Sequence, residues 1–415
     1  MAKAIVILSD GTGNTSSKGV SNVYRLVELL SVSEPRRQLV VYDEGIGTPR
    51  SGLRQARALE REPDAKGFHV LDGPLRLGPI NLLLRPLEMA FGLGLTRNVK
   101  QLYRALAERY EDEDTVYFFG FSRGAFTVRA LAGLIYRCGL PQRDTTDFNA
   151  VFREAWNHFT PMEYRKADVD EWRHRRDQRR CVIHFLGIWD TVKSYGGLRP
   201  RLLPHLRHNP IVKTVRHAIA LDEKRGWFNV TTWGRLDLDR HGAMTRIAPA
   251  DCDAIEQQDI REVWFRGCHS DIGGGDEEEV TAVIARQWMF AEACDPGLAF
   301  VKDGQKLLIS DAGRRFLSAA LAKTVRKGPP DETRGQPGVH ESLTRAWSFV
   351  DLVPRREIDN SGRWPRRRKQ LPGELHAHRS PELFLRDATV SMHESVGDLP
   401  VGRKATIVST RLWSD

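Results

Sequence analysis

A serine lies between two glycines in the motif Gly120-x-Ser122-x-Gly124. Residues 116–119, just before the motif, are β-branched or aromatic, as in a buried strand, and from Ala125 onward apolar side chains recur at helical spacing. A strand, this motif and a helix together form a nucleophile elbow, which exposes the serine Oγ at the carboxyl end of the strand. The pattern predicts that Ser122 is a nucleophile, and the alternative is a structural turn with an ordinary serine.

A serine nucleophile needs a histidine as base and a carboxylate that orients this histidine. His269 follows a predicted strand and precedes three glycines, so we predict that it is the base, with His393 as the alternative. Asp190 lies just past the end of an apolar strand and is the predicted acid, with Asp271 as the alternative. The chain order serine, aspartate, histidine is the order found in hydrolases built on such a sheet.

The Gly-rich loop that begins at Asp10 is the candidate for an oxyanion hole. It follows the first predicted strand, residues 4–8, and the amide of Gly11 or Thr12 is expected to act together with the amide of Arg123. A phosphate cradle is the competing interpretation of a Gly-rich loop at this place. Neither Gly-x-Gly-x-x-Gly nor Gly-Lys-Ser/Thr occurs in the chain, so nucleotide binding is disfavoured.

Several acidic residues and one histidine follow predicted strands, which leaves a metallohydrolase as a second interpretation. The residues concerned are Asp10, Asp43, Asp190, His269 and Asp271. A metal-dependent phosphoesterase would leave the serine motif unexplained. The preferred interpretation therefore has no metal and no cofactor.

Alternating strand and helix patterns predict an α/β fold with a mostly parallel sheet and helices on both of its faces. Residues 1–300 are expected to form the catalytic domain, with insertions near 50–95 and 148–180 over the catalytic edge. Residues 301–415 are expected to form a less regular extension packed on the same domain. Residues 214–225 are predicted to be helical, which places His217 on a helix as a satisfied core histidine, and His184 is expected to be a core residue too.

The composition is that of a soluble protein with a basic surface. The chain has 415 residues, a formal net charge of +9 and five widely spaced cysteines without a Cys-x-x-Cys pair, which favours reduced thiols in the cytoplasm. The N-terminal apolar run is too short for a signal peptide, and no stretch is long enough to span a membrane. Arginine clusters at 173–180 and 366–369 could contact anionic lipid, whereas nothing indicates a specific nucleic acid or a partner protein.

The successive motifs resemble those of the DUF2235 family of α/β-hydrolases, which includes the Tle1-like phospholipase effectors of bacterial type VI secretion. The motifs are Asp10-Gly11-Thr12, residues 42–48, 120–125, 187–192, 216–225 and 269–275, with residues 393–396 as a terminal motif. The resemblance implies a serine esterase that acts on (phospho)lipid esters, with Ser122, Asp190 and His269 at the triad positions. It also brings secretion as an effector into consideration. An inactive hydrolase-fold module that binds a membrane or a protein is the non-enzymatic alternative.

Overall fold

A computed structural model describes most of the first 300 residues and two short segments beyond them. The described residues are 2–11, 21–30, 33–44, 60–61, 66–71, 94–161, 165–192, 203–223, 225, 228, 230–233, 249–265, 267–275, 280–294, 298, 390–393 and 405–408. Thr12, much of the predicted 50–95 insertion and most of the predicted 301–415 extension lie outside this part of the chain.

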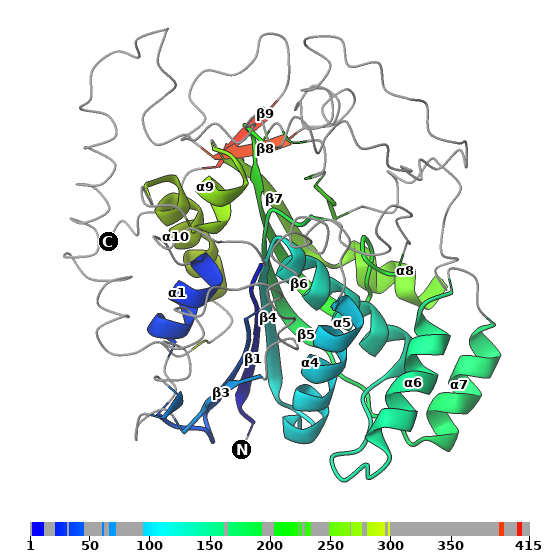
Figure 1. The fold of residues 1–415 in the computed structure, drawn as a ribbon. Helices are drawn as coiled ribbons and strands as arrows, with labels where there is room; N and C mark the ends of the chain where they lie inside the picture. The colour runs from blue at the N-terminus through cyan, green and yellow to red at the C-terminus, as the bar shows by residue number, and fades with distance from the viewer. Residues whose placement is uncertain are drawn as a thin grey trace, which may run out of the picture.

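One parallel sheet organises the molecule (Figure 1). Among the described residues it has nine strands in the order β3-β2-β1-β4-β5-β6-β7-β8-β9, and each neighbouring pair is parallel. The strands are β1 (Ala4–Ser9), β2 (Gln38–Asp43), β3 (Phe68–Val70), β4 (Thr115–Phe121), β5 (Ile183–Trp189), β6 (Val212–Ala220), β7 (Asp259–Phe265), β8 (Val390–His393) and β9 (Ala405–Val408). Both β1 and β2 are buried along their whole length, as expected of a parallel sheet covered on two faces.

Helices cover both faces of the sheet, as the sequence predicted (Figure 1). They are α1 (Asn22–Leu29), α4 (Leu95–Arg109), α5 (Arg123–Cys138), α6 (Phe148–Phe159), α7 (Lys166–Arg175), α8 (Pro249–Glu256), α9 (His269–Gly273) and α10 (Val280–Cys294). The α1 and α10 helices pack on one face, and α4 and α5 pack on the other. The fold is therefore α/β-hydrolase-like.

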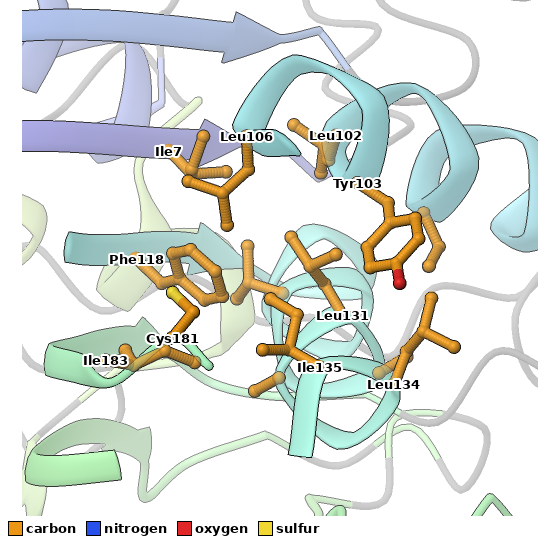
Figure 2. Close-up of a cluster of buried hydrophobic side chains, with 14 of the residues drawn as sticks. Ile7, Leu102, Tyr103, Leu106, Phe118, Leu131, Leu134, Ile135, Cys181 and Ile183 are labelled. Atoms are coloured by element: carbon orange, nitrogen blue, oxygen red, sulfur yellow. The ribbon is translucent and has the colours of Figure 1, made fainter. Parts of the chain in front are cut away.

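The core on the α4–α5 face is built from strand and helix side chains that meet at close range. Figure 2 shows Leu131 and Ile135 of α5 facing Ile7, Phe118 and Ile183 of the sheet. Nearly all of α5 is buried, so this helix is enclosed by the sheet, by α4 and by α6. Its first turn, which directly follows Ser122, is held rigidly as a result.

The segment predicted to be helical at residues 214–225 is a strand instead, because β6 spans Val212–Ala220. The prediction relied on an Ala- and Leu-containing run with helical propensity. The β-branched residues Val212, Val215 and Ile219 occur in the same run, and pairing with β5 on one side and β7 on the other overrides the helical preference. His217 therefore lies on a central strand.

The insertion at 148–180 does contain helices, α6 and α7, but these do not lie over the catalytic edge as predicted. They pack on α5, where Gly133 is close to Phe159 and Cys138 donates to the carbonyl of Ala155 at 3.3 Å. Both contacts are in the carboxyl-terminal half of α5, whereas Ser122 precedes its first residue. The rings of Phe148 and Phe152 in α6 pack against Tyr103 of α4, which helps to explain this placement.

Two strands of the sheet come from the last quarter of the chain, since β8 and β9 continue the sheet beyond β7. The boundary predicted near residue 300 stays a prediction. Three buried cysteines in the described part, Cys138, Cys181 and Cys268, are free thiols, and burial raises the pKa of each to about 12. Within the same part of the chain, no helix has the length and apolar character needed to cross a membrane.

Candidate active site

Ser122 occupies a sharp turn between β4 and α5. Its backbone has φ 57° and ψ −117°, a conformation that non-glycine residues rarely adopt. The surroundings stabilise this strain, because the Ser122 amide donates to the carbonyl of Trp189 at 3.0 Å and its own carbonyl accepts from Val192 at 3.3 Å. The turn also needs Gly124, where a Cβ atom would lie only 2.0 Å from the carbonyl oxygen of Ser9. The local structure is thus that of a nucleophile elbow.

The register of the sheet brings the acid beside the serine. Phe121 pairs with Trp189, so the residues that follow them, Ser122 and Asp190, leave neighbouring strands at the same level. Asp190 has φ 38°, a left-handed conformation that aspartate tolerates better than most residues. Its side chain is fully buried, and its Oδ1 accepts the amide hydrogen of Ala220 at 3.1 Å. The carboxylate is therefore fixed in direction.

His269 connects these two residues. It is the first residue of α9, and its Nε2 lies 2.7 Å from Ser122 Oγ while its Nδ1 lies 2.6 Å from Asp190 Oδ2. An ionised carboxylate only accepts hydrogen bonds, so Nδ1 carries the proton and Nε2 is left as the acceptor for the serine hydroxyl. This arrangement can remove the proton of Ser122 as its Oγ attacks a carbon centre.

Two aromatic rings hold the imidazole in place. The ring of Phe121 lies 4.6 Å from that of His269, and the ring of Phe228 meets it edge-on at 4.8 Å. Phe121 comes from the elbow itself, whereas Phe228 follows β6. The base is therefore confined from two sides by elements that also carry the rest of the site.

The alternative site residues have other places in the structure. Asp271 Oδ2 accepts the amide hydrogen of Cys268 at 2.8 Å and caps the turn that carries the base. His393 is the last residue of β8, and its side chain lies outside the described part. His184 is only partly buried, and its Nδ1 accepts the amide hydrogen of Val116 at 3.2 Å, so it is a hydrogen-bonded residue at the margin of the core.

The predicted oxyanion loop lies directly against the serine. A Cβ atom on Gly11 would be 2.9 Å from Ser122 Cβ, so only glycine allows this approach. The Gly11 amide donates to Asp10 Oδ1 at 2.7 Å. The side chain of Asp10 is buried, and its Oδ2 accepts hydrogen bonds from Ser21 Oγ and, at 3.0 Å, from Tyr42 Oη. Burial raises the pKa of Asp10 to about 6. A single carboxylate thus organises the start of the loop.

The other acidic residues at this edge of the sheet have separate partners. Asp43 Oδ2 accepts from Ser9 Oγ at 2.8 Å and from Asn98 Nδ2 at 3.0 Å. In the described part of the chain, no three histidine, cysteine, aspartate or glutamate side chains are grouped so that they could hold a metal ion.

Three residues that support this site, Glu223, Phe228 and Tyr42, are not among the predicted site residues. Glu223 and Phe228 lie after β6, in or beside the segment that was interpreted as a helix, where their approach to a strand-end site was not expected. Tyr42 belongs to a predicted strand and to the 42–48 motif, neither of which predicts a role in the site. A useful signal would have been the acidic pair Asp222-Glu223 directly after an apolar run, the same pattern that identified Asp190.

The parallel sheet with helices on both faces and the strained serine turn place the chain in the α/β-hydrolase-like fold class. Within this class, the chain belongs to the family described as the type VI secretion phospholipase effector Tle1-like catalytic domain, whose model matches residues 3–292. The family points to lipid-ester hydrolysis, an esterase or lipase activity, as the general class of reaction.

Two other proteins are similar to the chain. The chain is 31% identical over 234 residues to an uncharacterized protein of Saccharomyces cerevisiae, YEL023C, and the match covers 54% of this chain and 32% of the yeast protein. A crystal structure of an uncharacterized protein from Pseudomonas aeruginosa aligns with 97% of this chain and 64% of its own, at 17% identity and a TM-score of 0.38. The chain spans less than two thirds of the length of both relatives.

Proposed function

We propose that the chain is a serine hydrolase that cleaves carboxylic esters of phospholipids through an acyl-enzyme intermediate. The observation that carries this proposal is the continuous hydrogen-bonded path from Ser122 Oγ through both nitrogens of His269 to Asp190. Membership in the phospholipase effector family supports a lipid as the substrate. The same membership introduces type VI secretion as the route by which the enzyme would reach its lipid.

In the first half of the proposed reaction, Ser122 Oγ forms a bond to the acyl carbon while His269 Nε2 takes the hydroxyl proton. The carbonyl oxygen becomes an oxyanion, for which the amides of Arg123 and Thr12 are the proposed donors, since the Gly11 amide already donates to Asp10 Oδ1. The intermediate then collapses, the bond from the acyl carbon to the alcohol oxygen breaks, and the imidazolium returns the proton to this oxygen. Asp190 stabilises the imidazolium throughout.

In the second half, water replaces the alcohol. His269 Nε2 takes a proton from the water as its oxygen attacks the acyl carbon of the ester on Ser122. Breakdown of this second intermediate releases the fatty acid and returns the proton to Ser122 Oγ. The net reaction consumes one water molecule per ester, and the enzyme is restored without a metal or a redox step.

The test compares the full chain with Ser122→Ala on vesicles of phosphatidylethanolamine and phosphatidylglycerol and on a soluble p-nitrophenyl ester. We expect Ser122→Ala to lose activity by a factor on the order of 10⁴ or more, with unchanged circular dichroism and melting temperature. A fluorophosphonate probe should label the wild type at Ser122, and mass spectrometry should find free fatty acid as a product.

Ser270→Ala is the matched control, since Ser270 lies one residue from the base and its Oγ contacts only Cys268 Sγ, at 3.4 Å, among the hydrogen bonds described. This variant should keep its activity and its labelling. Full ester hydrolysis by Ser122→Ala would contradict the proposal. So would a chelator-sensitive activity that releases phosphorylated products from an enzyme the fluorophosphonate does not label.

A further inference from the structure

The turn that carries the base is held by carboxylates at three consecutive amides. The pairs are Gly267 with Asp222 Oδ2 at 2.7 Å, Cys268 with Asp271 Oδ2 at 2.8 Å, and His269 with Glu223 Oε2 at 3.1 Å. Asp271 belongs to the turn itself, whereas Asp222 and Glu223 come from the segment after β6. Two of the three contacts therefore fix the turn to the neighbouring strand, the strand whose Ala220 amide also holds the acid Asp190.

Glu223 has a second partner that reaches the same histidine by another route. Its two carboxylate oxygens bind the guanidinium of Arg225, with Oε1 to Nε at 2.8 Å and Oε2 to Nη2 at 2.7 Å. The guanidinium carbon of Arg225 lies 3.7 Å from the centroid of the Phe228 ring. The same phenyl ring makes a T-shaped contact with the imidazole of His269. Glu223 thus supports the amide of His269 directly and its ring through Arg225 and Phe228.

The Glu223–Arg225 pair is withdrawn from solvent. The Glu223 side chain is fully buried and that of Arg225 is 12% exposed, so the two charges interact in a medium that screens them weakly. A neutral amide could accept a hydrogen bond from His269 without a buried charge and its desolvation cost. Because the Glu223–Arg225 ion pair beside His269 carries this cost, we look for a role of the pair in function.

We propose that Glu223 and Arg225 are positioning residues that orient His269 toward Ser122 and keep the charge beside the base balanced. This inference rests on the proposed hydrolase function. The charged groups of the described chain around His269 and its turn come from three elements: Asp190 after β5, the residues Asp222, Glu223 and Arg225 after β6, and Asp271 in α9. Because Glu223 and Arg225 neutralise one another, the carboxylate of Asp190 dominates the field at the imidazole.

Single charge changes in this pair should act in opposite directions on the pH dependence. Glu223→Gln leaves the Arg225 cation uncompensated, which disfavours an imidazolium, so the acid limb of the kcat/KM profile should move to lower pH. Arg225→Gln leaves a bare carboxylate, so the limb should move to higher pH. Shifts of about one pH unit are expected at these distances. The double variant should return the limb to its wild-type position.

The soluble ester is the substrate for these profiles, because it separates the chemistry from vesicle binding. We expect kcat of each single variant to fall about 10-fold or more with KM little changed, since misplacing a base affects the transition state rather than substrate binding. Glu292→Gln is the matched control, because Glu292 is the partner of buried Arg216 on the same strand, β6. It should lower the melting temperature without moving the acid limb.

The outcomes separate the inference from the function on which it rests. If fluorophosphonate does not label wild-type Ser122, the proposed function fails. If the wild type is labelled but both single variants keep the wild-type limb and kcat within twofold, the positioning role is overturned. If the charge variants do not fold, Phe228→Leu decides: a kcat reduced about fivefold with an unchanged limb supports the role, and an unchanged kcat contradicts it.

Discussion

Two carboxylate–imidazole pairs lie at neighbouring places in the sheet, and only one of them faces the serine. In the first, Asp190 Oδ2 and His269 Nδ1 are 2.6 Å apart, and in the second, Glu262 Oε1 and His217 Nδ1 are 2.8 Å apart. Each carboxylate selects the tautomer with the proton on Nδ1 and leaves Nε2 as an acceptor. By these criteria the two histidines are equally prepared to act as bases.

The difference lies in the group that reaches Nε2. His269 faces the hydroxyl of Ser122, whose proton can be transferred and whose oxygen can then attack a substrate. His217 accepts the backbone amide hydrogen of Thr191 at 3.2 Å, a proton that cannot be given up. The Thr191 hydroxyl is also near, at 3.3 Å, but its side chain is completely buried. An acid–base pair therefore becomes catalytic only through its third partner.

Burial gives the second pair a structural role. It lowers the pKa of His217, so this imidazole stays neutral, while Glu262 also accepts the amide hydrogen of Trp233 at 2.6 Å. The pair thus joins β6, β7 and the segment that contains Trp233. Because Thr191 directly follows Asp190, His217 also holds the backbone next to the proposed acid. One pair performs the proposed chemistry, and the other supports the frame around it.

Replacing each histidine by alanine should separate these roles most strongly. His269→Ala should lower kcat/KM for the soluble ester by a factor on the order of 10⁴ or more, because the base is lost, with little change in stability. His217→Ala should lower the free energy of unfolding by about 3 kcal/mol, since it creates a cavity and leaves buried polar groups without a partner. Kinetics and urea unfolding on the same preparations measure both effects.

The distinction between a catalytic His269 and a structural His217 would be contradicted if His217→Ala, while folded, lost as much activity as His269→Ala. Similar losses of stability in both variants would also weaken the comparison. Activity should therefore be measured below the melting temperature of the less stable protein, so that unfolding does not imitate a catalytic defect.

Replacing the carboxylates of Asp190 and Glu262 by amides should give a smaller difference in activity and stability between the two pairs. Asp190→Asn keeps the shape but permits the wrong imidazole tautomer, so kcat should fall by a factor of about 10³ to 10⁴. Glu262→Gln keeps an oxygen that can accept from both His217 and Trp233, so activity should stay within about twofold and stability should fall by about 1 kcal/mol. A Glu262→Gln enzyme with a 10³-fold lower kcat would show that both pairs are catalytic.

Much of this site follows from short patterns in the sequence. Ser122 was predictable because a strand, two glycines and a helix surround it, and Asp190 because it directly follows an apolar strand. The choice of His269 over His393 depended on its position after a strand. The fold class followed in the same way from the alternation of strand and helix patterns, and the family match supports it.

Other parts of the site depend on contacts between distant segments. His269 and Ser122 are 147 residues apart, and His217 and Glu262 are 45 apart, so no local pattern distinguishes the partner at Nε2. The helix predicted at 214–225 failed because pairing with two neighbouring strands outweighed local propensity. This error also concealed Glu223, whose role appears only when the segment after β6 is seen as a strand-end loop.

Asp10 tests the comparison through stability alone, as a buried carboxylate that has hydroxyl and amide partners but no imidazole. Burial raises its pKa from 3.8 to about 6, so the folded protein holds this proton more tightly than the unfolded chain. The resulting stabilisation is fully present below pH 3.8 and is lost as the pH rises through about 6, which amounts to about 3 kcal/mol. The carboxylates Asp190 and Glu262, by contrast, have an imidazole partner in the folded state.

Asp10→Asn removes this titration and provides the measurement. The difference in unfolding free energy between wild type and variant should change by about 2 kcal/mol between pH 4 and pH 7, and the wild type should lose stability relative to the variant as the pH rises. Urea unfolding at pH 4, 5, 6 and 7 measures this difference, and Asp43→Asn controls for a neighbouring buried carboxylate. A constant difference across these values would mean that Asp10 remains ionised throughout, with its hydroxyl and amide donors outweighing the cost of burial.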